Sequence, residues 1–364
     1  MSFEQTYTEL AESFFAEQHA WSDRNQVFRS PRSTFDAYDS GDLIGAAIDA
    51  DIVPHDLRQY ARICRDEARD TIGRSEYRFG TAGGTGNMHR DYRGQICIPY
   101  RHHLKLDPRQ AYRERQLQGD CVSMSKRTMR DQARCFDIGA LQQADDYVKR
   151  SATADLYSMR GHTGEGASPS RIAVAATKIG ILLETVVTSP EGEDWDFSSY
   201  DRYYKIGDRY GRTGLPRWIF ELNAEYGPRQ VAEIDTEEEL LTALWNGCGV
   251  GVGSSIGVSN RGGKDGVGFL SALRGSWAHD MAIIGFDDSQ QFHRETLIIW
   301  DQSWGEWNQL SDWPNEYGPR PQGAFVLTLS DTMRAVRGGE CHALSDSQGF
   351  RPRRQATLGA EGRI

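Results

Sequence analysis

The chain has 364 residues, of which 38% are hydrophobic and 26% charged, and its net charge is −10. These values are typical of a globular protein with one large core or two modest ones. The acidic balance argues against non-specific binding to nucleic acid or anionic membranes. No stretch approaches the ~20 apolar residues that span a bilayer. We therefore expect neither nucleic acid nor membrane as a partner.

The N-terminus and the cysteines indicate in which cellular compartment the protein is expected. Residues 1–21 include acidic side chains and lack an apolar run of signal-peptide length, which argues against export by a classical signal peptide. The six cysteines stand at irregular spacings, unlike a disulfide framework. Both features favour a reducing, cytoplasmic compartment, where a nucleophilic thiol would stay available.

The N-terminal part differs in composition from the rest of the chain. Residues 3–20 and 41–72 show helical periodicity, whereas residues 73–95 are Gly-rich and polar, as in a loop. We place the end of a largely helical N-terminal extension there, at residue 95, and the main domain at 96–335. From Gly338 the chain is polar and rich in Gly and Arg, which predicts a surface-hugging or mobile tail over 336–364.

Helical signals dominate residues 118–190, with one helix predicted over 121–136 and another over 170–180, where Pro169 and Gly180 supply start and stop signals. Strand signals come later in the chain, at 218–220, 250–256, 281–286, 296–300 and 325–329. A helix predicted over 236–245 interrupts them. A helical half before a strand-rich half predicts an α+β fold rather than alternating βαβ units.

A cysteine stands directly after a Gly-Asp turn, in the segment Gln116-Leu117-Gln118-Gly119-Asp120-Cys121. A thiol attacks as its thiolate, and the positive end of a helix favours that form, as does a nearby imidazolium. Cys121 is therefore the candidate nucleophile. Asp120 has two opposing effects: it would cap the helix, but its charge would oppose thiolate formation. The sequence leaves open which effect is larger.

Two later segments supply partners for this thiol. His279 begins a predicted strand, His279-Asp280-Met281-Ala282-Ile283-Ile284, and stands 158 residues after Cys121. Gln302, before Ser303-Trp304-Gly305, could orient the imidazole by a hydrogen bond, with Asp301 as its competitor because successive strand residues face opposite sides. An oxyanion would need further donors, for which the Cys121 backbone N–H and the amide of Gln116 or Gln118 are candidates, with a slight preference for Gln116.

The order cysteine, histidine, then an amide before Ser-Trp-Gly resembles the papain-like cysteine peptidase (peptidase C1-like) family. The resemblance covers roughly residues 110–332. It includes Gly164-Glu165-Gly166-Ala167-Ser168-Pro169 and its helix, the Asn246-Gly247 strand start, and Gly323-Ala324-Phe325-Val326. It implies a helical half facing a β-barrel-like half, with thiol and imidazole across a cleft. It also implies a peptide or protein substrate and no cofactor.

The chain departs from the family pattern at the site itself. The signature Cys-Gly-Ser-Cys-Trp is replaced by Gln118-Gly119-Asp120-Cys121-Val122. The position of the usual glutamine, six residues before the nucleophile, holds Arg115, and Gln116 is one residue closer to Cys121. Gln302 replaces the asparagine that orients the imidazole. An alternative alignment of Gln118-Gly119 would put Met124 at the nucleophile position and make the protein inert. We prefer the alignment on Cys121, which needs no gap.

These departures leave three functional hypotheses. The first is an active thiol hydrolase of the peptidase kind. The second is a weak or inactive papain-like domain that serves as a structural or interaction protein, for instance in a phage virion, with assembly partners bound through its termini. The third is acyl transfer to an amine, as in a transamidase.

Other motifs favour neither a metal nor a nucleotide. Cys97 with His102 and His103 would be only half of a zinc site. The Gly-rich loop at 80–86 lacks the Gly-Lys-Ser/Thr of a phosphate-binding loop, and the alternating glycines at 247–253 lie within a strand signal. A local basic stretch is best explained by internal ion pairs or a solvated helix face; it comprises Arg109, Arg113, Arg115, Lys126, Arg127, Arg130 and Arg134.

Overall fold

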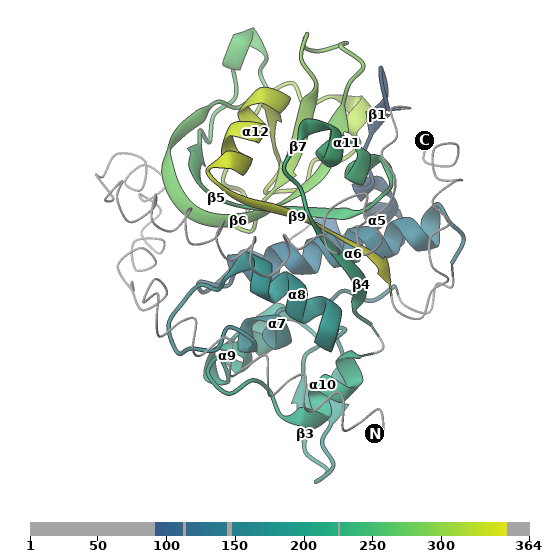
Figure 1. Ribbon diagram of the computed structural model, residues 1–364, viewed down its shortest axis with the longest axis vertical. Coiled ribbons are helices and arrows are strands. Elements are labelled where there is room, and N and C mark those ends of the chain that lie inside the picture. Colours follow the sequence, from purple (N-terminus) through teal and green to yellow (C-terminus); the bar gives the residue numbers. More distant parts are fainter. Residues whose placement is uncertain (1–91, 112–113, 144–147, 225, 348–364) are drawn as a thin grey trace.

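The computed structural model describes residues 92–111, 114–143, 148–224 and 226–347. They form an α+β structure in which a helical half and a sheet lie on either side of one long helix (Figure 1). The helices are α5 (Tyr100–Leu106), α6 (Cys121–Gly139), α7 (Ala154–Ser158), α8 (Pro169–Ile179), α9 (Tyr200–Arg209), α10 (Arg217–Asn223), α11 (Glu237–Trp245) and α12 (Leu329–Arg337).

The sheet is antiparallel, with the strand order β4-β9-β5-β6-β7-β8 and with β1 paired to β6. Its strands are β1 (Ile96–Cys97), β4 (Pro228–Glu233), β5 (Gly249–Val258), β6 (Leu273–Asp287), β7 (Leu297–Asp301), β8 (Phe325–Thr328) and β9 (Gly339–Ser347). A separate hairpin joins β2 (Val186–Thr188) to β3 (Asp194–Asp196). The described strands form a curved, open sheet with edges at β4 and β8 and not a closed barrel, whereas the family resemblance led us to expect a β-barrel-like half.

Helix α6 is the central element of the molecule. Every residue from Val122 to Ile138 is buried, and in Figure 1 the helix runs between the sheet and the helices of the other half. The glycines of β5 allow this close approach, because a Cβ at Gly249 would lie 1.9 Å from the Met129 carbonyl oxygen and one at Gly251 2.4 Å from the Met129 sulfur. The alternating glycines therefore serve helix-on-sheet packing.

Most of the predicted elements of the main domain are present. Helix α6 begins at Cys121 as expected, Ser168 caps α8 before Pro169, and Thr236 forms a capping box with Glu239 at the start of α11. Four of the predicted strands correspond to β5, β6, β7 and β8, although β6 begins six residues before His279.

The strand predicted at 218–220 was wrong, because this segment is part of α10. Pro216 precedes the helix, and Arg217 forms an ion pair one turn later with Glu221 on the exposed face, at 2.8 Å. Ile219 and Phe220 are buried among the apolar side chains of the helical half. A short apolar run does not by itself distinguish a buried helical turn from a strand.

The expected tail from Gly338 is not what the structure shows for residues 339–347. They form β9, which lies inside the sheet between β4 and β5. Cys341 and Ala343 are buried in the core of the sheet half, so the alternation of small apolar and polar residues was a strand pattern.

The expected helical N-terminal extension lies almost entirely outside the described residues. Within the described part of the chain, no helix is long and apolar enough to cross a membrane.

Candidate active site

Cys121 is the first residue of α6, and the turn before it is held by close contacts with Glu165 and Gly166. The backbone N–H of Gly166 donates to the Gly119 carbonyl at 3.0 Å, and a Cβ at Gly119 would lie 2.6 Å from that of Glu165. Only glycine therefore fits where this turn meets the 164–166 segment. The packing sets where α6 begins and so where its first side chain lies.

The Asp120 carboxylate does not cap α6 and instead binds the side chains of Tyr200 and Gln118. It accepts hydrogen bonds from the hydroxyl of Tyr200 at 3.0 Å and from the amide of Gln118 at 3.4 Å. Burial is the largest influence on this group and, against those hydrogen bonds, raises the pKa of Asp120 to about 7. At neutral pH the carboxyl next to the nucleophile is therefore only partly ionised.

The Cys121 thiol lies beside the backbone of β6. Burial raises its pKa to about 12; a hydrogen bond from the Asp280 backbone N–H lowers it, while the carboxylates of Asp280 and Asp120 add to the increase. The contact with Asp280 brings the thiol next to the residue directly after His279. Cys121 is partly exposed by its accessible surface, and with its pKa raised in this way the thiol is neutral at pH 7.

His279 lies within β6, opposite Ser254 of β5, and its ring is enclosed by tryptophans. Trp304 stacks on the imidazole with 4.1 Å between ring centroids and 22° between planes, and Trp277 contacts it edge-on. Burial lowers the pKa of His279 to about 3, and a hydrogen bond with the Gln302 side chain acts in the opposite direction. The imidazole is thus neutral over the physiological pH range.

The Gln302 side chain lies beside Trp304, whose indole stacks on the imidazole of His279. Gln302 comes just after the end of β7, and its Oε1 accepts the backbone N–H of Trp304 at 2.7 Å, which holds the amide and the stacking indole together. Asp301 is the last residue of β7, and its Oδ1 lies against Gly323, where a Cβ would be 3.1 Å away. Gln302 stays our prediction for the residue that orients the imidazole, with Asp301 as its competitor.

The two glutamine candidates before Cys121 have different surroundings. The amide of Gln118 donates both to the Tyr204 carbonyl, at 2.8 Å, and to Asp120. The Gln116 amide donates to the Gln118 carbonyl at 3.1 Å, which uses one of its two N–H groups, and its oxygen accepts from the Ser303 hydroxyl. Gln116 thus links the turn before Cys121 to Ser303, the residue after Gln302.

The described residues contain no group of three or more His, Cys, Asp or Glu side chains that could hold a metal ion. Cys97, which the sequence offered as half of a zinc site, is buried and donates its S–H to the Leu244 carbonyl at 3.6 Å. His102 packs edge-on against Phe136. These side chains have structural roles in the sheet half and at α6.

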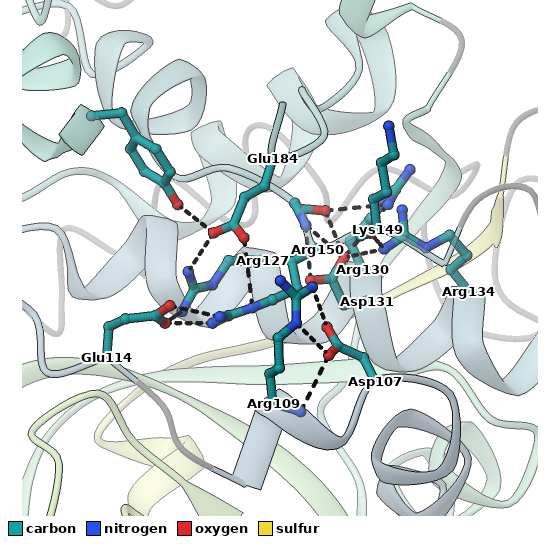
Figure 2. Close-up of polar contacts among 12 residues, drawn as sticks. Asp107, Arg109, Glu114, Arg127, Arg130, Asp131, Arg134, Lys149, Arg150 and Glu184 are labelled. Atoms are coloured by element: carbon teal, nitrogen blue, oxygen red, sulfur yellow. Dashed lines mark hydrogen bonds and ion pairs between the residues drawn. The ribbon is translucent and has the colours of Figure 1, made fainter. Parts of the chain in front are cut away.

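The arginines of α6 form internal ion pairs (Figure 2). This is one of the two explanations that we expected for the basic stretch, the other being a solvated helix face. Arg127 lies between Glu114 and Glu184, at 3.3 and 3.7 Å, and Arg134 pairs with Asp131 at 2.8 Å. Glu114 is just before the nucleophile segment, so the network anchors that segment to the helix.

Sequence reasoning missed one polar cluster next to the site. Lys126 of α6 and Asp280 of β6 form a fully buried ion pair, and Glu340 of β9 lies in the same region. The signal that could have revealed it is a charged residue, Asp280, inside an otherwise apolar buried strand, since such a charge needs a partner.

The structure has a thiol at the start of α6, an imidazole enclosed on β6 by Trp277 and Trp304, and a Gln302 amide held beside the stacking indole. Such a set can transfer a proton from sulfur to nitrogen while the sulfur attacks an electrophile. The first N–H groups of α6 have no partner within the helix and can stabilise developing negative charge.

No protein-family model and no curated protein sequence matches the chain. Among solved structures, it resembles xylellain, a cysteine protease from Xylella fastidiosa, with 13% identity and a TM-score of 0.41 over 64% of this chain and 81% of that one. It also resembles digestive procathepsin L2 proteinase from the larval midgut of Tenebrio molitor, with 11% identity and a TM-score of 0.41 over 94% and 100% of the two chains. For procathepsin B S9 from Trypanosoma congolense the values are 12% and 0.40, over 71% and 77%. Similarities at this level assign neither a family nor an activity, so we draw the function from this chain's own residues.

Proposed function

We propose that the chain is a cysteine-type hydrolase of the papain-like kind that cleaves peptide bonds in a peptide or protein substrate. Cys121 is the nucleophile, His279 the proton acceptor and Gln302 the group that orients the imidazole. The observation that carries the proposal is the position of Cys121 as the first residue of α6, a helix that a buried ion pair of 2.8 Å between Lys126 and Asp280 joins to β6 directly after His279.

In the proposed reaction, the Cys121 sulfur bonds to the substrate carbonyl carbon while its proton passes to His279. His279 then gives the proton to the departing amine, and water hydrolyses the resulting thioester. Because burial separates the two pKa values to about 12 and about 3, the resting site holds a neutral thiol and a neutral imidazole. Proton transfer would therefore accompany the attack rather than precede it, unlike in an enzyme with a preformed ion pair.

The oxyanion that forms during attack needs donors. The backbone N–H of Cys121, in the first turn of α6, is one, and the remaining N–H of the Gln116 amide is the other. The Gln118 amide is less suited, because its two N–H groups already donate to Tyr204 and Asp120.

A second candidate function is supported by the same burial. A thiol held neutral by its surroundings and an imidazole enclosed by Trp277 and Trp304 also suit a papain-like domain that has lost turnover and acts as an interaction protein. Binding partners at its termini, in a virion or another assembly, remain a prediction of this hypothesis.

Substitution of the two central residues tests the first proposal. We expect Cys121→Ala and His279→Ala each to reduce cleavage of a peptide library at least about 100-fold without unfolding the protein, because each removes a group that reacts directly. The products are read by mass spectrometry, with an added amine to detect acyl transfer. Cys97→Ala and His293→Ala are matched controls, since these residues bind the Leu244 carbonyl and Asp265 instead. Full turnover in either site variant would refute the proposal, and absence of turnover in the unaltered protein would favour the second candidate.

A further inference from the structure

A buried ion pair connects the helix of the nucleophile to the strand of the imidazole. The Lys126 ammonium lies 2.8 Å from Asp280 Oδ2, and neither side chain is exposed at all. Lys126 stands five residues after Cys121 in α6, and Asp280 comes directly after His279 in β6. The pair therefore links two elements that carry the proposed reacting groups.

Asp280 acts on the Cys121 sulfur in two opposite ways. Its backbone N–H donates a hydrogen bond to the thiol and favours the thiolate, whereas its carboxylate disfavours the thiolate by charge repulsion. The Lys126 ammonium is bound to that carboxylate and opposes its charge. The net effect of Asp280 on the sulfur thus depends on Lys126.

The other titratable groups that face this ion pair, Glu340 and His342, are mostly uncharged at pH 7. Asp280, Gly253 and Glu340 are cross-strand neighbours on β6, β5 and β9, and a Cβ at Gly253 would lie 3.6 Å from Asp280 Oδ2. Glu340 accepts the Ser170 backbone N–H at 3.2 Å, and burial raises its pKa to about 8, so it is mostly protonated at pH 7. Burial also lowers the pKa of His342, with Lys126 adding to the effect, so this imidazole is neutral.

We propose that Lys126 and Asp280 are positioning residues for Cys121: their ion pair joins α6 to β6 directly after His279, and the Lys126 ammonium offsets the carboxylate charge that opposes the thiolate. A buried ion pair is often no more stabilising than an apolar pair of the same size. The role that we assign to this pair is therefore control of the charge next to the thiol and not stabilisation of the fold. The importance of this control for catalysis rests on the proposed function, but its effect on the ionisation of Cys121 does not.

The substitution Asp280→Asn tests the charge directly. Asparagine keeps the shape, the backbone N–H and an acceptor for Lys126, but removes the negative charge next to the sulfur. At pH 8 thiol alkylation is proportional to the small thiolate fraction, so a pKa lower by one unit makes it tenfold faster. We expect the alkylation of Cys121 by iodoacetamide, resolved by peptide mass spectrometry in the full-length protein, to become about tenfold faster. An unchanged or slower rate would overturn the proposal.

Removal of the positive charge should have the opposite effect on Cys121, and a second substitution should reverse it. Lys126→Met leaves the Asp280 carboxylate without its cation, and we expect Cys121 alkylation at pH 8 to become about tenfold slower. The double variant Lys126→Met/Asp280→Asn removes both charges and should return to within about threefold of the unaltered protein. If Lys126→Met does not fold, the double variant and Asp280→Asn still decide. A double variant that stays ten or more times below the unaltered protein would mean a purely structural role and overturn the proposal.

Lys264→Met is the matched control, because Lys264 pairs with Asp331 at 2.6 Å in another part of the molecule. Its Cys121 alkylation rate should equal that of the unaltered protein; a tenfold change there would overturn the assignment to Lys126. Alkylation needs no turnover, so the two proposals fail separately. Shifted rates in a protein that cleaves no peptide refute only the hydrolase, and unshifted rates in an active enzyme refute only the role of the ion pair.

Discussion

The Asp120 carboxyl is surrounded by donors and yet is harder to ionise than an ordinary aspartate. Two hydrogen bonds, from Tyr200 and Gln118, favour its charged form, but complete burial has the larger effect and raises its pKa to about 7. The same balance applies to Cys121, where burial has a larger effect than the Asp280 N–H. The helix start alone therefore does not supply a thiolate in this site.

Asp120→Asn should change the pH dependence of stability. In the folded protein the group keeps its proton up to about pH 7, while in the unfolded chain it loses it near pH 3.8, so folding stability falls as the pH rises between these values. Three units correspond to about 4 kcal/mol. We expect the free energy of unfolding of the variant, relative to the unaltered protein, to rise by roughly this amount between pH 4 and pH 7.5. Urea denaturation at both pH values measures it, and parallel curves for the two proteins would contradict the prediction.

The contact of α6 with β5 shows how an element determines the site. The helix can lie on the strand only because positions 249 and 251 carry no side chain, and this packing fixes α6, and with it Cys121, relative to β6. The turn at Gly119 fixes the same helix at its start. Two close backbone contacts therefore hold the proposed nucleophile in position.

Gly249→Ala should push α6 away from the sheet. Its Cβ would lie 1.9 Å from the Met129 carbonyl oxygen, a backbone atom that cannot move alone, and we expect a loss of about 3 kcal/mol or more in the free energy of unfolding. Gly253→Ala is the comparison variant, because its added methyl group meets a less severe clash. Its Cβ would meet the Pro169 ring at 2.9 Å, so about 1 kcal/mol is expected. Urea unfolding of both variants measures the difference, and equal losses would show that the close approach at Gly249 does not limit stability.

Across the whole molecule, the helical half is joined to α6 by buried charges as much as by apolar packing. Arg127 of α6 and Arg150 both contact Glu114 and Glu184, and Tyr203 of α9 donates to Glu184 at 3.0 Å (Figure 2). Arginine suits this role because its planar guanidinium binds two carboxylates in fixed directions. The network connects the helical half to the segment that leads to Cys121.

Arg127→Met should destabilise the protein strongly, because it leaves two partly buried carboxylates with a single arginine. We expect a loss of about 3–5 kcal/mol in the free energy of unfolding. Arg217→Met removes the partner of Glu221 in an ion pair that is about half exposed, and it should cost less than about 1 kcal/mol. The two urea unfolding curves are compared at pH 7. A small loss for Arg127→Met would show that Arg150 alone neutralises Glu114 and Glu184.

The sequence by itself determined the elements with strong local signals. Helices α6, α8 and α11 begin where turns, proline and a capping box predict, so Cys121 is the first residue of its helix as expected. Local preferences suffice there, because a cap or a turn acts within a few residues.

Tertiary structure decided everything that depends on distant partners. Strand β9 and helix α10 were missed because pairing with β5 and burial in the helical half outweigh weak local signals. The open sheet depends on which strand edges pair, and the Lys126–Asp280 ion pair joins residues 154 positions apart. Burial, a property of the whole fold, sets the pKa values of Cys121 and His279, so the sequence could propose these two residues as reacting groups but could not give their ionisation.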